Sequence, residues 1–423
     1  MAELLRIATA GSVDDGKSTL IGRLLWDAKS IFEDQWEAIE RSSVQRGDVY
    51  TNLALLTDGL RAEREQGITI DVAYRYFATP RRKFILADTP GHLQYTRNMV
   101  TGASTADVAI VLVDARHGIV EQSRRHAFLA SLLRVQHIVL AVNKIDLVQF
   151  SEDVFRRLEL EFRALTARLD VPDVTAIPVS ALHGDNVVTR SDRTPWYGGP
   201  ALLEHLETLD VVADRNLDDA RFPVQYVIRP MSAAHPDYRG YAGQVASGVL
   251  RPGDDVEVLP SGRRTTIAGI DTFDGPVDAA YPPMSVTIRL ADDVDVSRGD
   301  LVVAAGSRPT VSQDLVATVC WMSDEPLRPG TRLAVKHTTR TAKAVVKEIG
   351  ERLDVTTFET GAAAELHLNE IAQVTLRTAL PLCYDDYRRN RATGAFILID
   401  EATGATVAAG MVGSSIVRAL AGA

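Results

Sequence analysis

Four short motifs lie in the first half of the chain, and each directly follows an apolar run of the kind that forms a buried strand. In order along the sequence these runs are 4–8, 84–87, 138–142 and 176–179. The carboxyl ends of parallel strands lie at one edge of a sheet, so residues that follow such runs meet in space. The arrangement therefore predicts an open α/β sheet with one ligand site at that edge.

The first motif, at 11–18, fits the phosphate-binding pattern Gly-x-x-x-x-Gly-Lys-Ser/Thr. Helical spacing follows at 19–25, so the N–H groups of a glycine-rich turn and of a helix N-terminus would face a phosphate. The pattern assigns Lys17 to the β- and γ-phosphates and the Ser18 hydroxyl to Mg²⁺. The predicted loop comprises Gly11, Ser12, Val13, Asp14, Asp15, Gly16, Lys17, Ser18 and Thr19.

The other three motifs, at 88–92, 143–146 and 180–182, complete a nucleotide site. Asp88 can hold a Mg²⁺-bound water, and the N–H of Gly91 can sense a γ-phosphate. The Asp146 carboxylate can accept hydrogen bonds from both N1–H and N2–H₂ of guanine, and the small Ala181 lets a backbone N–H approach the guanine O6. The predicted contacts are Asp88, Gly91, Asn143, Lys144, Asp146, Ser180, Ala181 and Leu182. A plain turn explains any one motif, but four in this order indicate a guanine-nucleotide switch protein.

Composition is consistent with a soluble protein of two or three domains. The 423 residues are 46% hydrophobic and 24% charged, and the net charge of −10 argues against non-specific binding to nucleic acid. The two cysteines, Cys320 and Cys383, lack metal-ligand spacing. We expect a cytoplasmic protein, because no signal peptide precedes the first strand and the apolar run 108–113 is too short to span a bilayer.

The pattern of apolar runs changes along the chain. Strand and helix patterns alternate up to about residue 210, and an acidic linker without period follows at 210–219. Short apolar runs separated by turn signals then predict a β-barrel of about 90 residues and a second all-β region. The predicted fold class is an α/β P-loop GTPase domain at 1–210, followed by β-barrel domains at 221–307 and 308–423.

A GTPase domain followed by two barrels resembles the translation-factor GTPases, the family of elongation factor Tu. The segment 60–70 resembles the first switch of that family. The resemblance implies that Thr69 completes the Mg²⁺ shell and that His92 orients the attacking water. It also implies that Val13 and Ile68 form an apolar gate that holds this histidine back.

Three segments give a finer resemblance, to the GTPase (large) subunit of bacterial sulfate adenylyltransferase, of the CysN and NodQ type. They are 11–20, where Asp15 stands in place of the histidine of tRNA-delivery factors, and the C-terminal segments 336–340 and 390–400. Some relatives carry a fused adenylylsulfate kinase. We expect no kinase activity here, since no second phosphate-binding loop occurs before Ala423.

The resemblance implies a heterodimer that uses GTP and Mg²⁺. A smaller partner subunit would form adenosine 5′-phosphosulfate and pyrophosphate from ATP and sulfate, and GTP hydrolysis on this chain would drive that unfavourable reaction. Membrane binding is not expected. The alternative is a translation factor that delivers aminoacyl-tRNA, which shares the domain order and all four motifs. Asp15 and the two C-terminal segments favour the sulfate enzyme, and a regulatory GTPase without an enzyme partner is disfavoured because two barrels imply a docking surface.

Overall fold

The computed structural model forms two compact units, which follow one another along the chain with the change at Val211 and Val212. It describes residues 4–29, 71–90, 96–169, 171–230, 238–355 and 359–413, together with positions 37, 39, 41, 43, 53 and 357. Among these residues no helix is long and apolar enough to cross a membrane.

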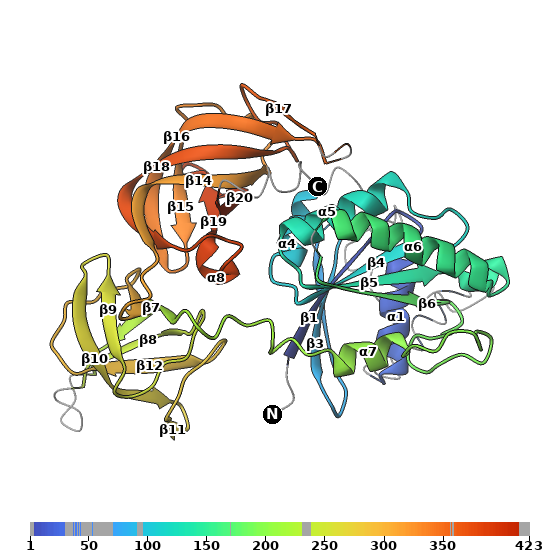
Figure 1. The fold of residues 1–423 in the computed structure, drawn as a ribbon, viewed down its shortest axis with the longest axis horizontal. Coiled ribbons are helices and arrows are strands. Elements are labelled where there is room, and N and C mark those ends of the chain that lie inside the picture. The colour runs from blue at the N-terminus through green and yellow to red at the C-terminus, as the bar shows by residue number, and fades with distance from the viewer. Residues whose placement is uncertain are drawn as a thin grey trace. The chain divides into compact units, whose positions relative to one another are not determined.

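The first unit is built on a six-stranded sheet in the order β2-β3-β1-β4-β5-β6, in which all neighbours are parallel except β2 and β3. Its strands are β1 (Leu4–Gly11), β2 (Ala73–Ala78), β3 (Lys83–Asp88), β4 (Val108–Asp114), β5 (His137–Asn143) and β6 (Asp173–Pro178). Its helical segments are α1 (Lys17–Asp27), α4 (Thr96–Ala103), α5 (Glu121–Leu132), the short 3₁₀ turn η3 (Ile145–Val148), α6 (Glu152–Arg168) and α7 (Leu202–Thr208). Figure 1 shows helices on both sides of this sheet.

Burial explains why the central strands are continuous apolar runs. Every residue of β4 is buried, as expected for a parallel strand that is covered on both faces. Helix α6 instead buries one stripe, Phe155, Leu158, Phe162 and Leu165, at the spacing of one helical face. It begins at Ser151, whose hydroxyl accepts the N–H of Val154, a favourable N-terminal cap.

The second unit contains two further sheets, each of which closes on itself. In the first, β9, β10, β12, β8, β7 and β13 form a ring, and β11 extends it by two residues. Strand β10 closes the ring, because its residues 263–266 pair with β9 and its residues 267–271 pair with β12, with a register shift between Ile267 and Gly269. The strands are β7 (Arg221–Ile228), β8 (Gly240–Gln244), β9 (Asp255–Leu259), β10 (Arg263–Thr272), β11 (Gly275–Pro276), β12 (Ser285–Leu290) and β13 (Leu301–Ala304).

The second ring consists of β15, β19, β20, β14, β18 and β16, with the three-residue β17 beside β16. Alternate residues of β16 point inward, so Ala342, Ala344 and Val346 are buried in its core. The strands and the helical turn are β14 (Thr310–Trp321), β15 (Arg332–His337), β16 (Arg340–Leu353), β17 (Thr360–Ala362), β18 (Ile371–Tyr384), α8 (Arg391–Gly394), β19 (Ala395–Ile399) and β20 (Thr406–Val412). The predicted fold class, an α/β domain followed by two β-barrels, is confirmed; the exact domain boundaries stay a prediction.

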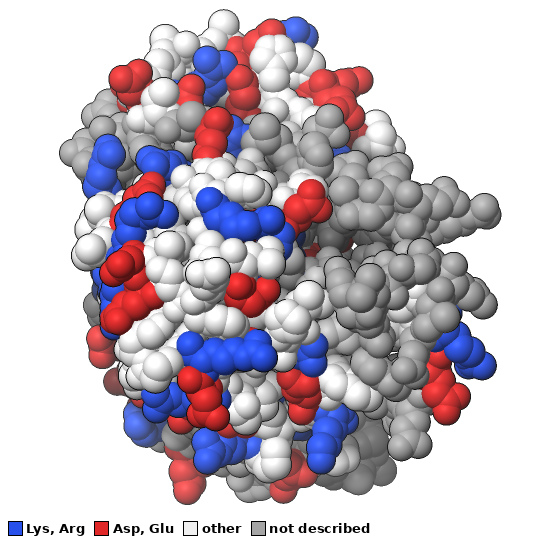
Figure 2. Space-filling view, turned by 90° about the vertical axis from the view of Figure 1, so that its right-hand side faces the viewer, with Lys and Arg blue, Asp and Glu red and all other residues white. Residues whose placement is uncertain are grey.

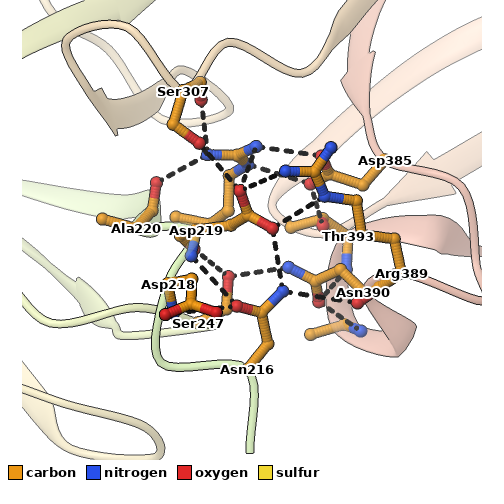
Figure 3. Close-up of polar contacts among 12 residues, drawn as sticks. Asn216, Asp218, Asp219, Ala220, Ser247, Ser307, Asp385, Arg389, Asn390 and Thr393 are labelled. Atoms are coloured by element: carbon orange, nitrogen blue, oxygen red, sulfur yellow. Dashed lines mark hydrogen bonds and ion pairs between the residues drawn. The ribbon is translucent and has the colours of Figure 1, made fainter.

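A buried polar network, here called the inter-barrel cluster, joins the two rings within the second unit (Figure 3). Arg221 of β7 is 1% exposed and donates two hydrogen bonds of 2.9 Å to Asp385, which follows β18. Arg389 donates two more, of 2.8 and 2.6 Å, to Asp219. Hydrogen bonds add Asn216, Ser247, Ser307, Asn390 and Thr393 to the inter-barrel cluster. The charged groups of the two barrels therefore pair with one another, with Arg221, Asp385 and Asp219 buried and the side chain of Arg389 at the surface.

Candidate functional site

The loop between β1 and α1 has the shape that a phosphate-binding loop requires. Gly16 adopts a left-handed conformation with φ of 93° immediately before the first residue of α1. A Cβ at this position would lie 2.5 Å from Nδ2 of Asn143, so a larger residue would both strain the backbone and displace the third motif. The first N–H groups of α1 lie at the carboxyl edge of the sheet, where they could bind an anion.

Lys17 lies within this loop and is only 7% exposed. Its ammonium donates hydrogen bonds of 2.9 Å to the carbonyl oxygens of both Gly11 and Ser12. Burial lowers the pKa of the amine, and the nearby carboxylates of Asp88, Asp15 and Asp14 oppose that shift without cancelling it. An anion that binds in the loop would therefore meet a positive charge that is poorly hydrated and already held in place by the carbonyls of Gly11 and Ser12.

Asn143 ties three of the four motifs together. Its Nδ2 donates to the carbonyl of Asp15 at 2.7 Å, and its Oδ1 accepts the N–H of Ala181 at 2.9 Å. The end of β5 thereby holds both the phosphate-binding loop and the loop that follows β6. Because β1 and β5 are separated only by β4, the predicted convergence at one edge of the sheet is what the fold produces.

Asp88 ends β3, next to β1, and its side chain is buried. The hydroxyl of Thr9 donates to its Oδ1 at 3.4 Å, and the charge of this carboxylate raises the pKa of Lys17 against the effect of burial. Ser18, at the second position of α1, is partly exposed. A hydroxyl and a carboxylate are hard oxygen donors of the kind that Mg²⁺ prefers.

Asp146, the last residue of the third motif, lies in the 3₁₀ turn η3, and its side chain is 14% exposed. His183, two residues beyond Ala181, places Nε2 at 3.7 Å from Oδ2 of Asp146. The backbone of Ser180 turns the loop tightly, since its carbonyl accepts the N–H of Gly184 at 2.7 Å. The carboxylate predicted to read guanine thus stays accessible at the rim of the site.

Comparisons with known proteins agree with this geometry. The family model described as elongation factor Tu GTP binding domain matches residues 2–215, about half of the chain. A second model, GTP-eEF1A C-terminal domain-like, matches residues 314–413. Sulfate adenylyltransferase subunit 1 of Bacteroides fragilis is 54% identical over 412 residues, which cover 97% of this chain and 86% of that protein. The chain belongs to the sulfate adenylyltransferase subunit 1 family.

Other members of the family agree. The bifunctional enzyme CysN/CysC of Mycobacterium tuberculosis is 63% identical over 414 residues, covering 97% of this chain and 67% of that protein. Sulfate adenylyltransferase subunit 1 of Alteromonas mediterranea is 50% identical over 412 residues, covering 97% and 87%. The predicted resemblance to this subunit is confirmed, and a domain of the elongation factor Tu type is a GTP-binding domain.

Four predicted site residues of this family member, Ile68, Thr69, Gly91 and His92, lie outside the described residues. Val13, with which Ile68 was predicted to form the gate, is described and partly exposed in the phosphate-binding loop. Thr19 continues α1 and is likewise partly exposed. The roles of all six residues stay predictions.

Arg23, on α1, contributes to the site although the motifs did not point to it. Its Nε donates to the carbonyl of Ala181 at 3.2 Å, and its Nη2 donates to the carbonyl of Leu182. The fourth motif is therefore held from α1 as well as from β5. No pattern in the sequence singles out this arginine, because its partners are backbone atoms some 160 residues away.

Asp15 is a buried carboxylate inside the loop, and its Oδ2 accepts the N–H of Ser12 at 2.6 Å. Burial raises the pKa of this group, and the hydrogen bond from Ser12 and the charge of Lys17 only partly oppose the effect. Its contribution to stability is therefore greatest below the pKa of the unfolded chain and is lost as pH rises through the raised pKa of the folded state.

An Asp15→Asn chain is expected to be more stable than the parent when free of nucleotide, and the gain should grow with pH. The amide can still accept the N–H of Ser12 but carries no charge to desolvate. Thermal unfolding between about pH 4 and pH 7 measures the difference, with the exposed Asp14→Asn as the matched control. A gain that stays the same at every pH would contradict the burial effect.

Proposed function

We propose that this chain is the GTPase subunit of a sulfate adenylyltransferase. GTP hydrolysis here drives a smaller partner subunit to form adenosine 5′-phosphosulfate and pyrophosphate from ATP and sulfate. The observation that carries the proposal is the 54% identity over 97% of the chain with a protein named sulfate adenylyltransferase subunit 1. That name implies a second subunit, and we propose that it supplies the residues for adenylyl transfer.

Within the GTP site, each motif has a proposed task. Lys17 and the N–H groups at the start of α1 bind the phosphates, and Asp146 accepts the two guanine donors. Ser18, Thr69 and Asp88 fit as the residues that hold Mg²⁺, which when bound neutralises charge on the β- and γ-phosphates. His92 orients the attacking water when the partner subunit rearranges the apolar gate of Val13 and Ile68.

Surface charge gives no support to the alternative, delivery of aminoacyl-tRNA. Basic and acidic side chains are interspersed over the face drawn in Figure 2, without a field of one sign. The net charge of −10 argues against non-specific binding to nucleic acid, which depends on cationic surface.

The test is pyrophosphate release by this chain co-purified with its partner subunit, with and without GTP. We expect GTP to stimulate release, and the chain alone to hydrolyse GTP slowly and to form no adenosine 5′-phosphosulfate. A pair that responds equally with and without GTP, or a lone chain that forms the product, would overturn the proposal.

An Asp146→Asn pair provides the matched control. Asparagine can donate to the C2 carbonyl oxygen that xanthine has in place of the guanine amino group, so GTP should no longer stimulate the variant pair, and xanthosine triphosphate should do so instead. Stimulation by xanthosine triphosphate ties the effect to this site and excludes an indirect action of GTP on the partner. Unchanged preference for GTP would remove Asp146 from base recognition.

A further inference from the structure

We infer that Asp114 is a positioning residue of the nucleotide site, which fixes the ammonium of Lys144 against the phosphate-binding loop. The inference deepens the proposed function and rests on the guanine-nucleotide site described above. None of the four motifs contains Asp114, which reads in the sequence as the polar end of the apolar run 108–113.

Asp114 occupies the one strand end that lies between the first and third motifs. It is the last residue of β4, which pairs on one side with β1 and on the other with β5, where it is in register with Asn143. Its side chain is 2% exposed. A buried carboxylate at this place is costly unless it is fully paired, so its partners indicate its role.

Lys144 is one of these partners, and it links Asp114 to the loop. Its Nζ lies 3.0 Å from Oδ2 of Asp114 and donates to the carbonyl of Asp14 at 2.5 Å. Both Lys144 and Asp14 adopt left-handed backbone conformations, with φ of 58° and 67°. Such conformations are unfavourable for residues with side chains and persist where surrounding contacts hold them, as this bridge does.

Arg116 satisfies the rest of the carboxylate. Its backbone N–H and Nε donate to Oδ1 of Asp114 at 2.9 and 3.0 Å, and its Nη2 donates to Oδ2 at 2.6 Å. The imidazole of His117 lies further off, with Nδ1 at 3.7 Å from Oδ2. Burial alone would raise the pKa of Asp114, but the hydrogen bonds from Arg116 and Lys144 outweigh it and lower that pKa. The carboxylate of Asp114 is therefore charged and can act as the counter-ion of Lys144.

Two side chains of the third motif thus hold two successive carbonyls of the phosphate-binding loop. Asn143 holds the carbonyl of Asp15, and Lys144, anchored by Asp114, holds that of Asp14. Without the carboxylate, the ammonium would keep a single fixed acceptor and could turn toward water. Asp114 acts in this way on nucleotide affinity through Lys144, without touching the nucleotide.

The test is a double-mutant cycle on the affinity for fluorescent GDP, measured on the full chain. Asp114→Asn is expected to weaken GDP about tenfold to a hundredfold, the effect of one charge-assisted hydrogen bond. Lys144→Met should weaken it at least as much. Because both changes break the same bridge, the double variant should bind no more weakly than Lys144→Met alone.

Asp107→Asn is the matched control. Asp107 precedes β4 at the opposite edge of the sheet, where its carboxylate accepts the N–H of Arg6 at 2.8 Å. This variant makes the same change, from a charged carboxylate to a neutral amide, beside the same strand, and it should bind GDP as the parent does. Equal losses of affinity in Asp107→Asn and Asp114→Asn would show that Asp114 only stabilises the fold and does not position Lys144.

Additive losses for Asp114→Asn and Lys144→Met would overturn the inference, since independent residues add. Should Asp114→Asn fail to fold, Asp114→Glu carries the same cycle, because it keeps the charge and displaces the carboxylate by one methylene. A parent chain that does not bind GDP would instead refute the proposed nucleotide site, so the two failures are distinguishable.

Discussion

A Lys17→Met chain is expected to bind GTP roughly 30- to 4,000-fold more weakly than the parent. Removing one partner of a buried, hydrogen-bonded charge pair costs about 2–5 kcal/mol, and every 1.4 kcal/mol is about tenfold in affinity. The ammonium of Lys17 is positioned inside the loop by the carbonyls of Gly11 and Ser12, so its interaction with a phosphate needs little rearrangement. Equilibrium titration with a fluorescent GTP analogue measures the loss.

The same variant should leave the nucleotide-free protein at least as stable as the parent. Burial lowers the pKa of Lys17, which means that the folded chain disfavours the charged amine, and methionine has no charge to desolvate. Lys29→Met, an exposed change just beyond the same helix, controls for the loss of one positive charge. Normal GTP affinity in Lys17→Met, or a large fall in its unfolding temperature, would contradict this assignment.

An Arg221→Met chain is expected to lose about 3–5 kcal/mol of folding free energy in the second unit. Breaking a buried ion pair from one side costs this much, because the remaining charge stays buried without its partner. Here the remaining charge is Asp385, which is 5% exposed and would keep only the hydroxyl of Thr393 among the hydrogen bonds described in the inter-barrel cluster. Hydrogen exchange of peptides from both barrels in increasing urea measures the loss.

Two further variants separate charge from packing. Arg221→Met with Asp385→Asn should recover part of the stability, since no buried charge then remains at that pair. Arg221→Lys should remain well below the parent, because an ammonium cannot make the two parallel hydrogen bonds of the guanidinium. A loss of less than about 1 kcal/mol in Arg221→Met, the range of an exposed ion pair, would mean that the inter-barrel cluster does not stabilise the fold.

Much of the first unit could be predicted from the sequence because its information is local. Each motif follows its own strand, and parallel strands bring their carboxyl ends to one edge whatever their order. Asp114 escaped prediction for the opposite reason. Its partner Lys144 follows the neighbouring strand β5, and the role of the pair depends on the carbonyl of Asp14 in the phosphate-binding loop. The nearby Arg116 does not by itself distinguish Asp114 from the polar end of any other buried strand.

In the second unit the strands were predictable and their pairing was not. Turn signals between short apolar runs indicated barrels, but β14 pairs with β18 and β20, some 50 to 90 residues later along the chain. The segment 210–219 illustrates the same limit. Its acidic, aperiodic sequence predicted a linker, and it does contain no helix or strand, yet its last residue, Asp219, is buried against Arg389. A partner 170 residues away cannot be inferred from local composition.

Closure of both rings has a consequence for aggregation. A sheet with a long free edge can pair with a strand from another molecule, and such pairing is a common route to fibres. Within the described part of the second unit, strands beyond the rings are only β11 and β17, of two and three residues. A neighbouring molecule would have to break an existing ladder before it could add a strand, so the barrels should stay monodisperse at concentrations where an open sheet of the same composition would associate.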